Sequence, residues 1–87
     1  MKIFKYGLAV RDDVRIALPR GARILCVQVQ DVRPCLWALV DPEAPTCERL
    51  FCWRGTGQEM GVALEGTYVG TVQLARLVFH LFDCGAA

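Results

Sequence analysis

The sequence contains no serine and only one histidine, His80, among its 87 residues. The absence of serine excludes a serine nucleophile, and no cysteine-protease motif surrounds any of the five cysteines. A single histidine in an apolar stretch is more typical of a packed, hydrogen-bonded side chain than of a catalytic base. We therefore expect a protein that is not an enzyme.

Closely spaced clusters of cysteines are also missing. The nearest pair, Cys47 and Cys52, has four residues between its members, a spacing that permits two zinc ligands but is not specific for them. We therefore expect neither a metal site nor a cofactor. The cysteines are interpreted as buried or half-buried thiols that pack as small apolar side chains.

No apolar run reaches the length of about 18 residues that a membrane-spanning helix requires. The opening stretch meets Lys2, Lys5 and then Gly7 too early to form the apolar core of a signal peptide. Because the number of cysteines is odd and no export signal precedes them, we expect reduced thiols. These features predict a cytoplasmic location.

The sequence has no block of charge of one sign. Ten basic and nine acidic residues interleave along the chain and give a formal net charge of +1, so neither a nucleic acid nor a membrane surface is an expected partner. Eight of the ten basic residues are Arg. This bias suits bidentate recognition of anions, although a GC-rich genome produces the same bias.

Apolar residues make up 54% of the chain and charged residues 22%, a composition typical of a folded protein. The length predicts a single domain over residues 1–87. A domain of this size buries only about 60 to 65% of its unfolded surface, so its stability margin is thin. Oligomerisation is one way to widen that margin.

Alternating apolar and polar residues, separated by turn residues, predict short strands. The clearest case places Val14, Ile16 and Leu18 on one face. The expected strands are Lys2 to Leu8, Val14 to Leu18, Arg23 to Gln30, Cys35 to Val40, Glu48 to Arg54, Thr67 to Leu74 and Arg76 to Phe82. They predict an all-β fold, a small antiparallel sandwich or barrel of about six to seven strands. One helical turn is expected within Met60 to Leu64, and Gly70 predicts a bulge or a close backbone approach.

Two of these strands, Cys35 to Val40 and Leu77 to Phe82, are apolar on both faces. A strand of this kind is either covered from both sides or lies at an interface. We interpret Trp37 as a core residue. Because so small a domain has more apolar strand surface than one core can hide, we expect a homodimer or a higher oligomer.

The segment around Arg54 is the main candidate for a binding site. Free backbone amides at Gly55, Thr56 and Gly57 beside an Arg could hold an anion, but the third Gly or the Lys of the known phosphate loops is missing. As an ordinary loop between strands, the segment needs no ligand. Trp53 and Arg54 would alternatively form the aromatic and cationic anchor of a protein interface.

Several blocks of the sequence resemble a family of short bacteriophage and prophage proteins of unknown function. The blocks are Met1 to Tyr6, Pro34 to Pro42, Gly55 to Gly57, and Tyr68 to Thr71 with Leu77 to His80. The resemblance spans nearly the whole chain, and the five cysteines depart from the family pattern. It supplies no catalytic residues.

A phage setting implies a protein that occupies a host component in the host cytoplasm. The first expectation is an inhibitor that docks on a host defence protein through Trp53, Arg54 and the loop Gly55 to Gly66. The alternative is an oligomeric sponge that sequesters a signalling nucleotide, with Arg33 and Arg76 joining the loop residues around a pocket. An accessory or structural phage protein is the third possibility.

Overall fold

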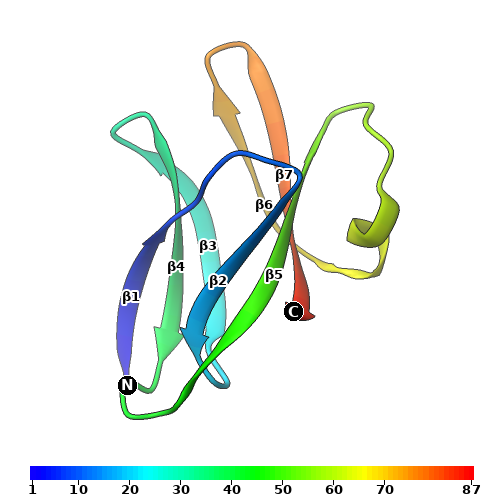
Figure 1. Cartoon of the computed structure of the whole chain (residues 1–87). Helices are drawn as coiled ribbons and strands as arrows, with labels where there is room; N and C mark the ends of the chain where they lie inside the picture. The colour runs from blue at the N-terminus through cyan, green and yellow to red at the C-terminus, as the bar shows by residue number, and fades with distance from the viewer.

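The computed structural model describes all 87 residues and consists of seven strands and one short 3₁₀ turn, η1 (Figure 1). The elements are β1 (Lys2–Gly7), β2 (Asp13–Pro19), β3 (Arg23–Gln30), β4 (Arg33–Val40), β5 (Thr46–Gly55), η1 (Gly61–Glu65), β6 (Thr67–Leu74) and β7 (Leu77–Ala86). The predicted all-β fold is confirmed. So is the helical turn between the fifth and sixth strands.

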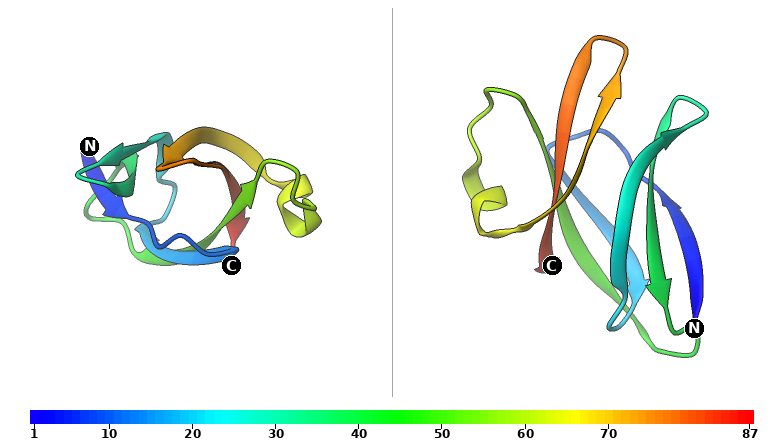
Figure 2. Two further views of the ribbon diagram at one scale, coloured as in Figure 1. Left: turned by 90° about the horizontal axis from the view of Figure 1, so that it is seen from above. Right: turned by 180° about the vertical axis from the view of Figure 1, so that it is seen from behind.

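The strands form two antiparallel sheets that face each other. The three-stranded sheet has the order β1-β4-β3, and the four-stranded sheet has the order β2-β5-β7-β6. Seen from above, the strands surround a flattened interior (Figure 2), but hydrogen bonding does not close them into a barrel. Of the two predicted architectures, the fold is therefore the sandwich.

The two sheets approach each other most closely along β3 and β6. A Cβ placed on Gly70 would lie 2.8 Å from Cγ1 of Val27, which only glycine avoids. The register of β6 against β7 shifts between Tyr68 and Gly70, so this glycine marks both a bulge and a close approach, as predicted. On the other side of the sandwich, β1 and β2 are edge strands that pair along one side only.

The core lies between the sheets and is built from alternate residues of the paired strands. Leu36 and Ala38 of β4 point into it from one sheet, and Phe51 and Trp53 of β5 from the other. Trp37 is not part of this cluster. It follows Leu36 on β4, and the alternation of side chains places it on the opposite face of the sheet. The interpretation of Trp37 as a core residue is therefore wrong.

The β3–β4 hairpin is tighter than the sequence suggested. Asp31 and Val32 both have positive φ angles, of 52° and 60°, as a two-residue type I′ turn requires. The ladder therefore begins already at Arg33, opposite Gln30, rather than at Cys35.

The chain has no helix of the length and apolarity needed to cross a membrane.

Candidate interaction surface

The side of the three-stranded sheet that faces away from the core carries no second layer. Residues opposite each other in antiparallel strands point to the same side, and side chains alternate along each strand. Lys5 lies opposite Trp37 and Gly7 opposite Cys35, so these residues share one side of the sheet. We call this side the outer face. Its residues are Ile3, Lys5, Gly7, Arg23, Leu25, Cys26, Gln28, Gln30, Arg33, Cys35, Trp37 and Leu39.

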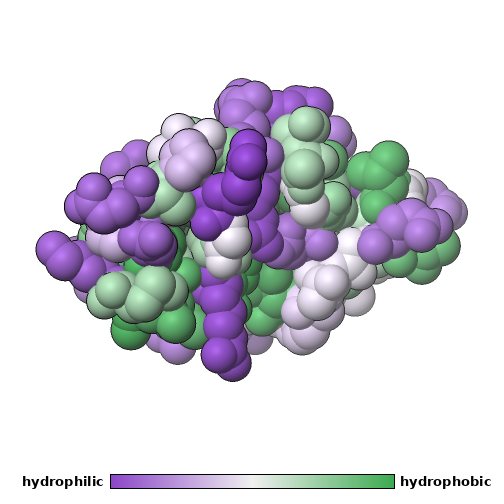
Figure 3. Space-filling view, turned by 90° about the horizontal axis from the view of Figure 1, so that it is seen from below, coloured by the Kyte–Doolittle hydropathy of each residue, from purple (hydrophilic) through white to green (hydrophobic).

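The centre of the outer face is apolar. Ile3 is 60% exposed and Leu25 is 42% exposed, and together with half-buried Trp37 and Cys26 they line a shallow hollow of about 330 Å³. A bulge in β3 between Ile24 and Cys26 brings both Leu25 and Cys26 to this side. In Figure 3 hydrophobic residues gather on the side of the molecule where the three-stranded sheet lies, and again at the opposite end near η1.

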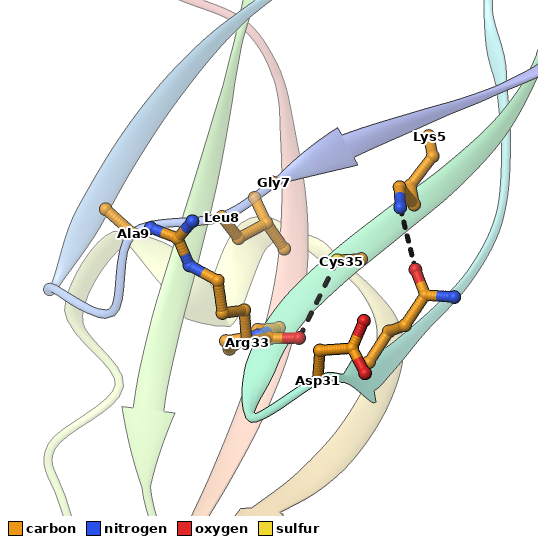
Figure 4. A pocket seen from close by; sticks show the side chains of 9 residues that line it. Lys5, Gly7, Leu8, Ala9, Asp31, Arg33 and Cys35 are labelled. Carbon is orange, nitrogen blue, oxygen red and sulfur yellow. Dashed lines mark hydrogen bonds between the residues drawn. The ribbon is translucent and has the colours of Figure 1, made fainter.

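A second, more polar hollow of about 440 Å³ lies at the end of the outer face beside the β3–β4 turn, and it extends past that face to Leu8, Ala9 and Pro34 (Figure 4). It exists because Gly7 and Cys35 form a pair of small residues, so the sheet surface is low between them. A Cβ added to Gly7 would meet no atom within 4 Å. The lining residues are Lys5, Gly7, Leu8, Ala9, Gln30, Asp31, Arg33, Pro34 and Cys35.

Two cationic side chains line this polar hollow. The ammonium of Lys5 donates a hydrogen bond to Oε1 of Gln30 at 2.7 Å, which spans the sheet from β1 to β3 above β4. The guanidinium of Arg33 has no hydrogen bond or ion pair within the chain, and the carboxylate of Asp31 has none either. In Figure 4 Lys5 and Arg33 flank Cys35. The hollow thus offers free donors.

Charge is distributed very unevenly between the two sheets. The strands of the three-stranded sheet contain four of the ten basic residues, Lys2, Lys5, Arg23 and Arg33, and none of the nine acidic ones. All four are exposed. Although the whole chain is nearly neutral, this sheet therefore carries charge of one sign, and three of its four cations belong to the outer face.

Arg54, predicted as a surface anchor, is buried and serves the fold. It is only 7% exposed. Its Nε donates to the carbonyl of Met60 at 2.8 Å, and its Nη1 donates to the carbonyls of Asp12 and Trp53 at 3.0 and 2.8 Å. Nη1 also lies 3.8 Å from a carboxylate oxygen of Asp13. The guanidinium therefore links two loops to β5. This geometry does not agree with the prediction that Arg54 contacts a ligand or a partner.

Trp53 is likewise a core residue and not an exposed anchor. It is 2% exposed, and its indole Nε1 donates to the carbonyl of Ala9 at 3.0 Å. Its ring packs edge-on against Phe79, with 6.2 Å between the centroids. The sequence shows the alternation along β5 that puts Trp53 on one face of the strand. The roles assigned to the two tryptophans were nevertheless reversed, because Trp53 lies in the core and Trp37 does not.

The remaining predicted site residues are not brought together. The amide of Gly55 donates to Oε1 of Gln58 at 2.8 Å, so it is not free for an anion. The hydroxyl of Thr56 hydrogen-bonds Nε2 of His80 at 2.9 Å, and Gly57 continues this turn. Arg76 lies in the β6–β7 turn, whereas Arg33 lines the polar hollow, which none of the other predicted site residues reaches.

His80 is packed and hydrogen-bonded through both ring nitrogens, as the sequence predicted. Its Nδ1 contacts the hydroxyl of Thr71 at 2.9 Å, and the hydroxyl of Tyr68 hydrogen-bonds the same Thr71 hydroxyl at 2.5 Å. With Thr56 at Nε2, the imidazole of β7 lies between Thr71 of β6 and Thr56, which follows the end of β5. Both ring nitrogens of His80 are thus occupied by threonine hydroxyls.

Two of the five cysteines, Cys52 and Cys84, lie in contact beside η1. Their sulfur atoms are 3.3 Å apart, and the Cys84 thiol also reaches the carbonyl of Val62 at 3.9 Å. Burial, with smaller contributions from Cys84 and Asp13, raises the pKa of Cys52 to about 12. Cys52 therefore stays protonated and unreactive at neutral pH.

Sequence reasoning missed the residues that shape the outer face, namely Ile3, Lys5, Gly7 and Leu25. A usable signal was present in the two-sided apolar pattern of β4, which predicted either cover from both sides or an interface. A second signal was the complete lack of Asp and Glu in the three strands. Only the pairing of β1 with β4 and of β3 with β4 shows that these signals fall on one surface.

A family model described as Domain of unknown function (DUF7352) matches residues 1–86 of the chain. No curated protein matches the chain significantly, and no solved structure does. The family match spans nearly the whole chain, and its description names no substrate, ligand or partner.

Proposed function

Since the chain belongs to the family described as Domain of unknown function (DUF7352), whose description assigns no activity, we propose a function from its surface: a binding protein that docks on another protein through the outer face. The supporting observation is that Trp37, Ile3 and Leu25 form an apolar centre on a sheet that has no covering layer. Burying such a centre is the main source of affinity in protein interfaces.

The outer face has the composition of an interface. Its centre holds an aromatic side chain among aliphatic ones, and its rim carries the uncharged Gln28 and Gln30 with a few cations. Tryptophan is among the residues most enriched at energetic hot spots, and interface cores are depleted of charge. The docking role therefore passes from Trp53, which is buried, to Trp37.

The outer face is also rigid before any partner binds. Its residues belong to strands whose backbone is paired on both sides in β4 and on one side in β1 and β3. A preformed surface loses little conformational freedom on binding. Such a scaffold suits a small protein that acts by occupying a site on its target. In the phage setting that the sequence resemblance implies, the target is a host protein and docking inhibits it.

Site-specific photocrosslinking tests this proposal. A benzoylphenylalanine at Ile3 or Leu25 is expected to crosslink one and the same protein in a lysate of the native host cells. The matched control places the crosslinker at Leu64 of η1, which is also apolar and is even more exposed, at 73%, but lies away from the outer face. Trp37→Ala should remove the crosslink from both outer-face positions and abolish any inhibition of the captured protein. A crosslink that forms equally from Leu64, or that survives Trp37→Ala, would contradict the proposal.

Nucleotide binding remains a second candidate because Lys5 and Arg33 line one hollow of about 440 Å³. This pair replaces the predicted site around Arg54, whose donors are used within the fold. Isothermal titration with ATP, GTP and cyclic dinucleotides checks it. Saturable binding that Arg33→Gln weakens would favour a nucleotide sponge, and heats indistinguishable from dilution would remove this candidate.

A further inference from the structure

We infer that the polar hollow on the outer face receives a carboxylate of the docked partner, so that the partner segment combines apolar side chains with Asp or Glu. This inference rests on the proposed docking function and adds the chemistry of the partner. Two neighbouring hollows on one face, an apolar one beside Trp37 and a cationic one beside Gly7, carry it.

The cationic hollow has donors to spare. The ammonium of Lys5 has three N–H donors, of which one is used by Gln30. The guanidinium of Arg33 has five and makes no hydrogen bond or ion pair within the chain. Because position 7 is glycine and the space above it is open, a side chain of a partner can reach between these two cations.

The two hollows lie at a fixed spacing. The Lys5–Trp37 pair stands between them, and Arg33 lies four residues from Trp37 on the same strand. At about 3.3 Å per residue, this separation is roughly 13 Å. An apolar side chain in the first hollow and a carboxylate in the second are therefore about 7 to 13 Å apart on the partner, a distance that one short peptide segment spans.

Charge selects this partner over two competing occupants. A second copy of the chain docked face to face would bring Lys5, Arg23 and Arg33 against the same cations, with no acid from either three-stranded sheet to offset them. A single-stranded nucleic acid needs several aromatic platforms, but Trp37 is the only aromatic residue on the outer face. The one acidic group at the hollow, Asp31, opposes a carboxylate from its rim.

Selection of peptides from a displayed random library on the immobilised chain tests the inference. The selected peptides are expected to place Asp or Glu near bulky apolar residues, and to be lost when the selection uses Trp37→Ala. For one synthetic peptide, changing its acidic residue to Gln should weaken binding about fivefold to tenfold, because a charge-assisted hydrogen bond is replaced by a weaker neutral one. Binding should also weaken as salt rises.

Two lysines on one strand provide a matched pair of variants. Lys5→Gln is expected to weaken the acidic peptide about fivefold, whereas Lys2→Gln, which changes an exposed lysine whose side chain points to the other side of β1, should change it less than twofold. Asp31→Asn, at a φ of 52° that Asn tolerates, should tighten binding about twofold. Equal losses for Lys5→Gln and Lys2→Gln would overturn the inference, because they would indicate only a general charge effect.

Filling the hollow gives a test without any change of charge. Gly7→Leu places a side chain into open space, so the melting temperature should move by no more than about 4 °C. The peptide and its Gln version should then bind this variant equally. If they still differ, the carboxylate binds elsewhere and the inference is wrong. Should the variant unfold, the lysine pair decides alone.

The outcomes separate this inference from the docking proposal. Peptides that require Trp37 but carry no acid would leave the docking face in place and overturn the carboxylate subsite. Peptides that ignore Trp37→Ala would overturn both. Sedimentation that shows a dimer of the chain, lost in Trp37→Ala, would make a second copy the occupant and would also overturn the inference.

Discussion

Nε of Arg54 donates a hydrogen bond to the main-chain carbonyl of Met60 at 2.8 Å. The same guanidinium reaches the carbonyl of Asp12 at 3.0 Å, so one buried side chain holds both the β1–β2 connection and the segment that leads into η1. A loop rich in glycine is thereby fixed to β5. The side chain that the sequence suggested for ligand binding is the internal clamp of this end of the molecule.

Arg54→Ala should therefore destabilise the protein. The change removes three hydrogen bonds from a guanidinium that is only 7% exposed, which we expect to lower the free energy of unfolding by roughly 2 to 4 kcal/mol. Chemical denaturation measures the loss. Arg15→Ala is the control, since Arg15 is exposed on β2 and makes no ion pair. A melting temperature unchanged in Arg54→Ala would contradict the clamp.

The two tryptophans should respond to truncation in opposite ways. Trp53→Ala removes a residue that is 2% exposed and is expected to cost about 3 to 5 kcal/mol of stability. Trp37→Ala empties a half-exposed site on the outer face and should cost no more than about 1.5 kcal/mol, while binding to a partner is lost.

Fluorescence offers an independent check on the same pair. In Trp53→Phe the remaining Trp37 should be quenched readily by acrylamide, and in Trp37→Phe the remaining Trp53 should be shielded. The reverse pattern would place Trp37 in the core and remove the basis of the docking face.

The contrast between these residues shows how far the sequence alone can go. Alternation along β4 and β5 predicts two strands with opposite faces, and turn residues such as Pro19 and Gly21 predict where strands end. Alternation is symmetric, however, and does not say which face is inside when both are apolar, as in β4. That choice depends on which strands pair and which sheet lies opposite.

The predicted surface role of Arg54 disagrees with its burial for a related physical reason. An Arg beside glycines favours an anion site only if its donors are free, and sequence does not show that Met60 and Asp12 return to Arg54. Gly7 in turn gives no sequence signal beyond ending a strand. Its importance arises from its position opposite Cys35, which no local pattern specifies.

Gly70 should be intolerant of substitution because of its contact across the seam between the sheets. In Gly70→Ala the new Cβ would lie 2.8 Å from Cγ1 of Val27 and 3.7 Å from its carbonyl oxygen. We expect a loss of about 1 to 3 kcal/mol in the free energy of unfolding, measured by denaturation. Gly7→Ala serves as the control, since its Cβ meets no atom within 4 Å.

A double-mutant cycle identifies the cause of that loss. If the clash with Val27 is responsible, Gly70→Ala combined with Val27→Ala should cost less than the sum of the single changes, by about 0.5 kcal/mol or more. Strict additivity would attribute the loss to the backbone of β6 instead.

The buried Cys52 thiol predicts how stability falls at alkaline pH. Burial, the Cys84 contact and nearby Asp13 raise the pKa of Cys52 from 9.0 to about 12. Between these two values the unfolded thiol loses its proton while the folded one keeps it, so the unfolded state binds fewer protons and stability decreases as pH rises. Below about pH 9 this contribution is constant.

The prediction is checked by comparing the protein with Cys52→Ala in urea denaturation between about pH 8 and pH 11. Cys52→Ala should begin less stable, because it leaves a cavity in a fully buried position, but its stability should fall less steeply above pH 9. The two proteins share every other residue, so the difference between the two slopes isolates Cys52. Parallel slopes would mean that the thiol ionises as readily in the folded chain as in the unfolded one. Burial beside Cys84 would then not raise the pKa of Cys52.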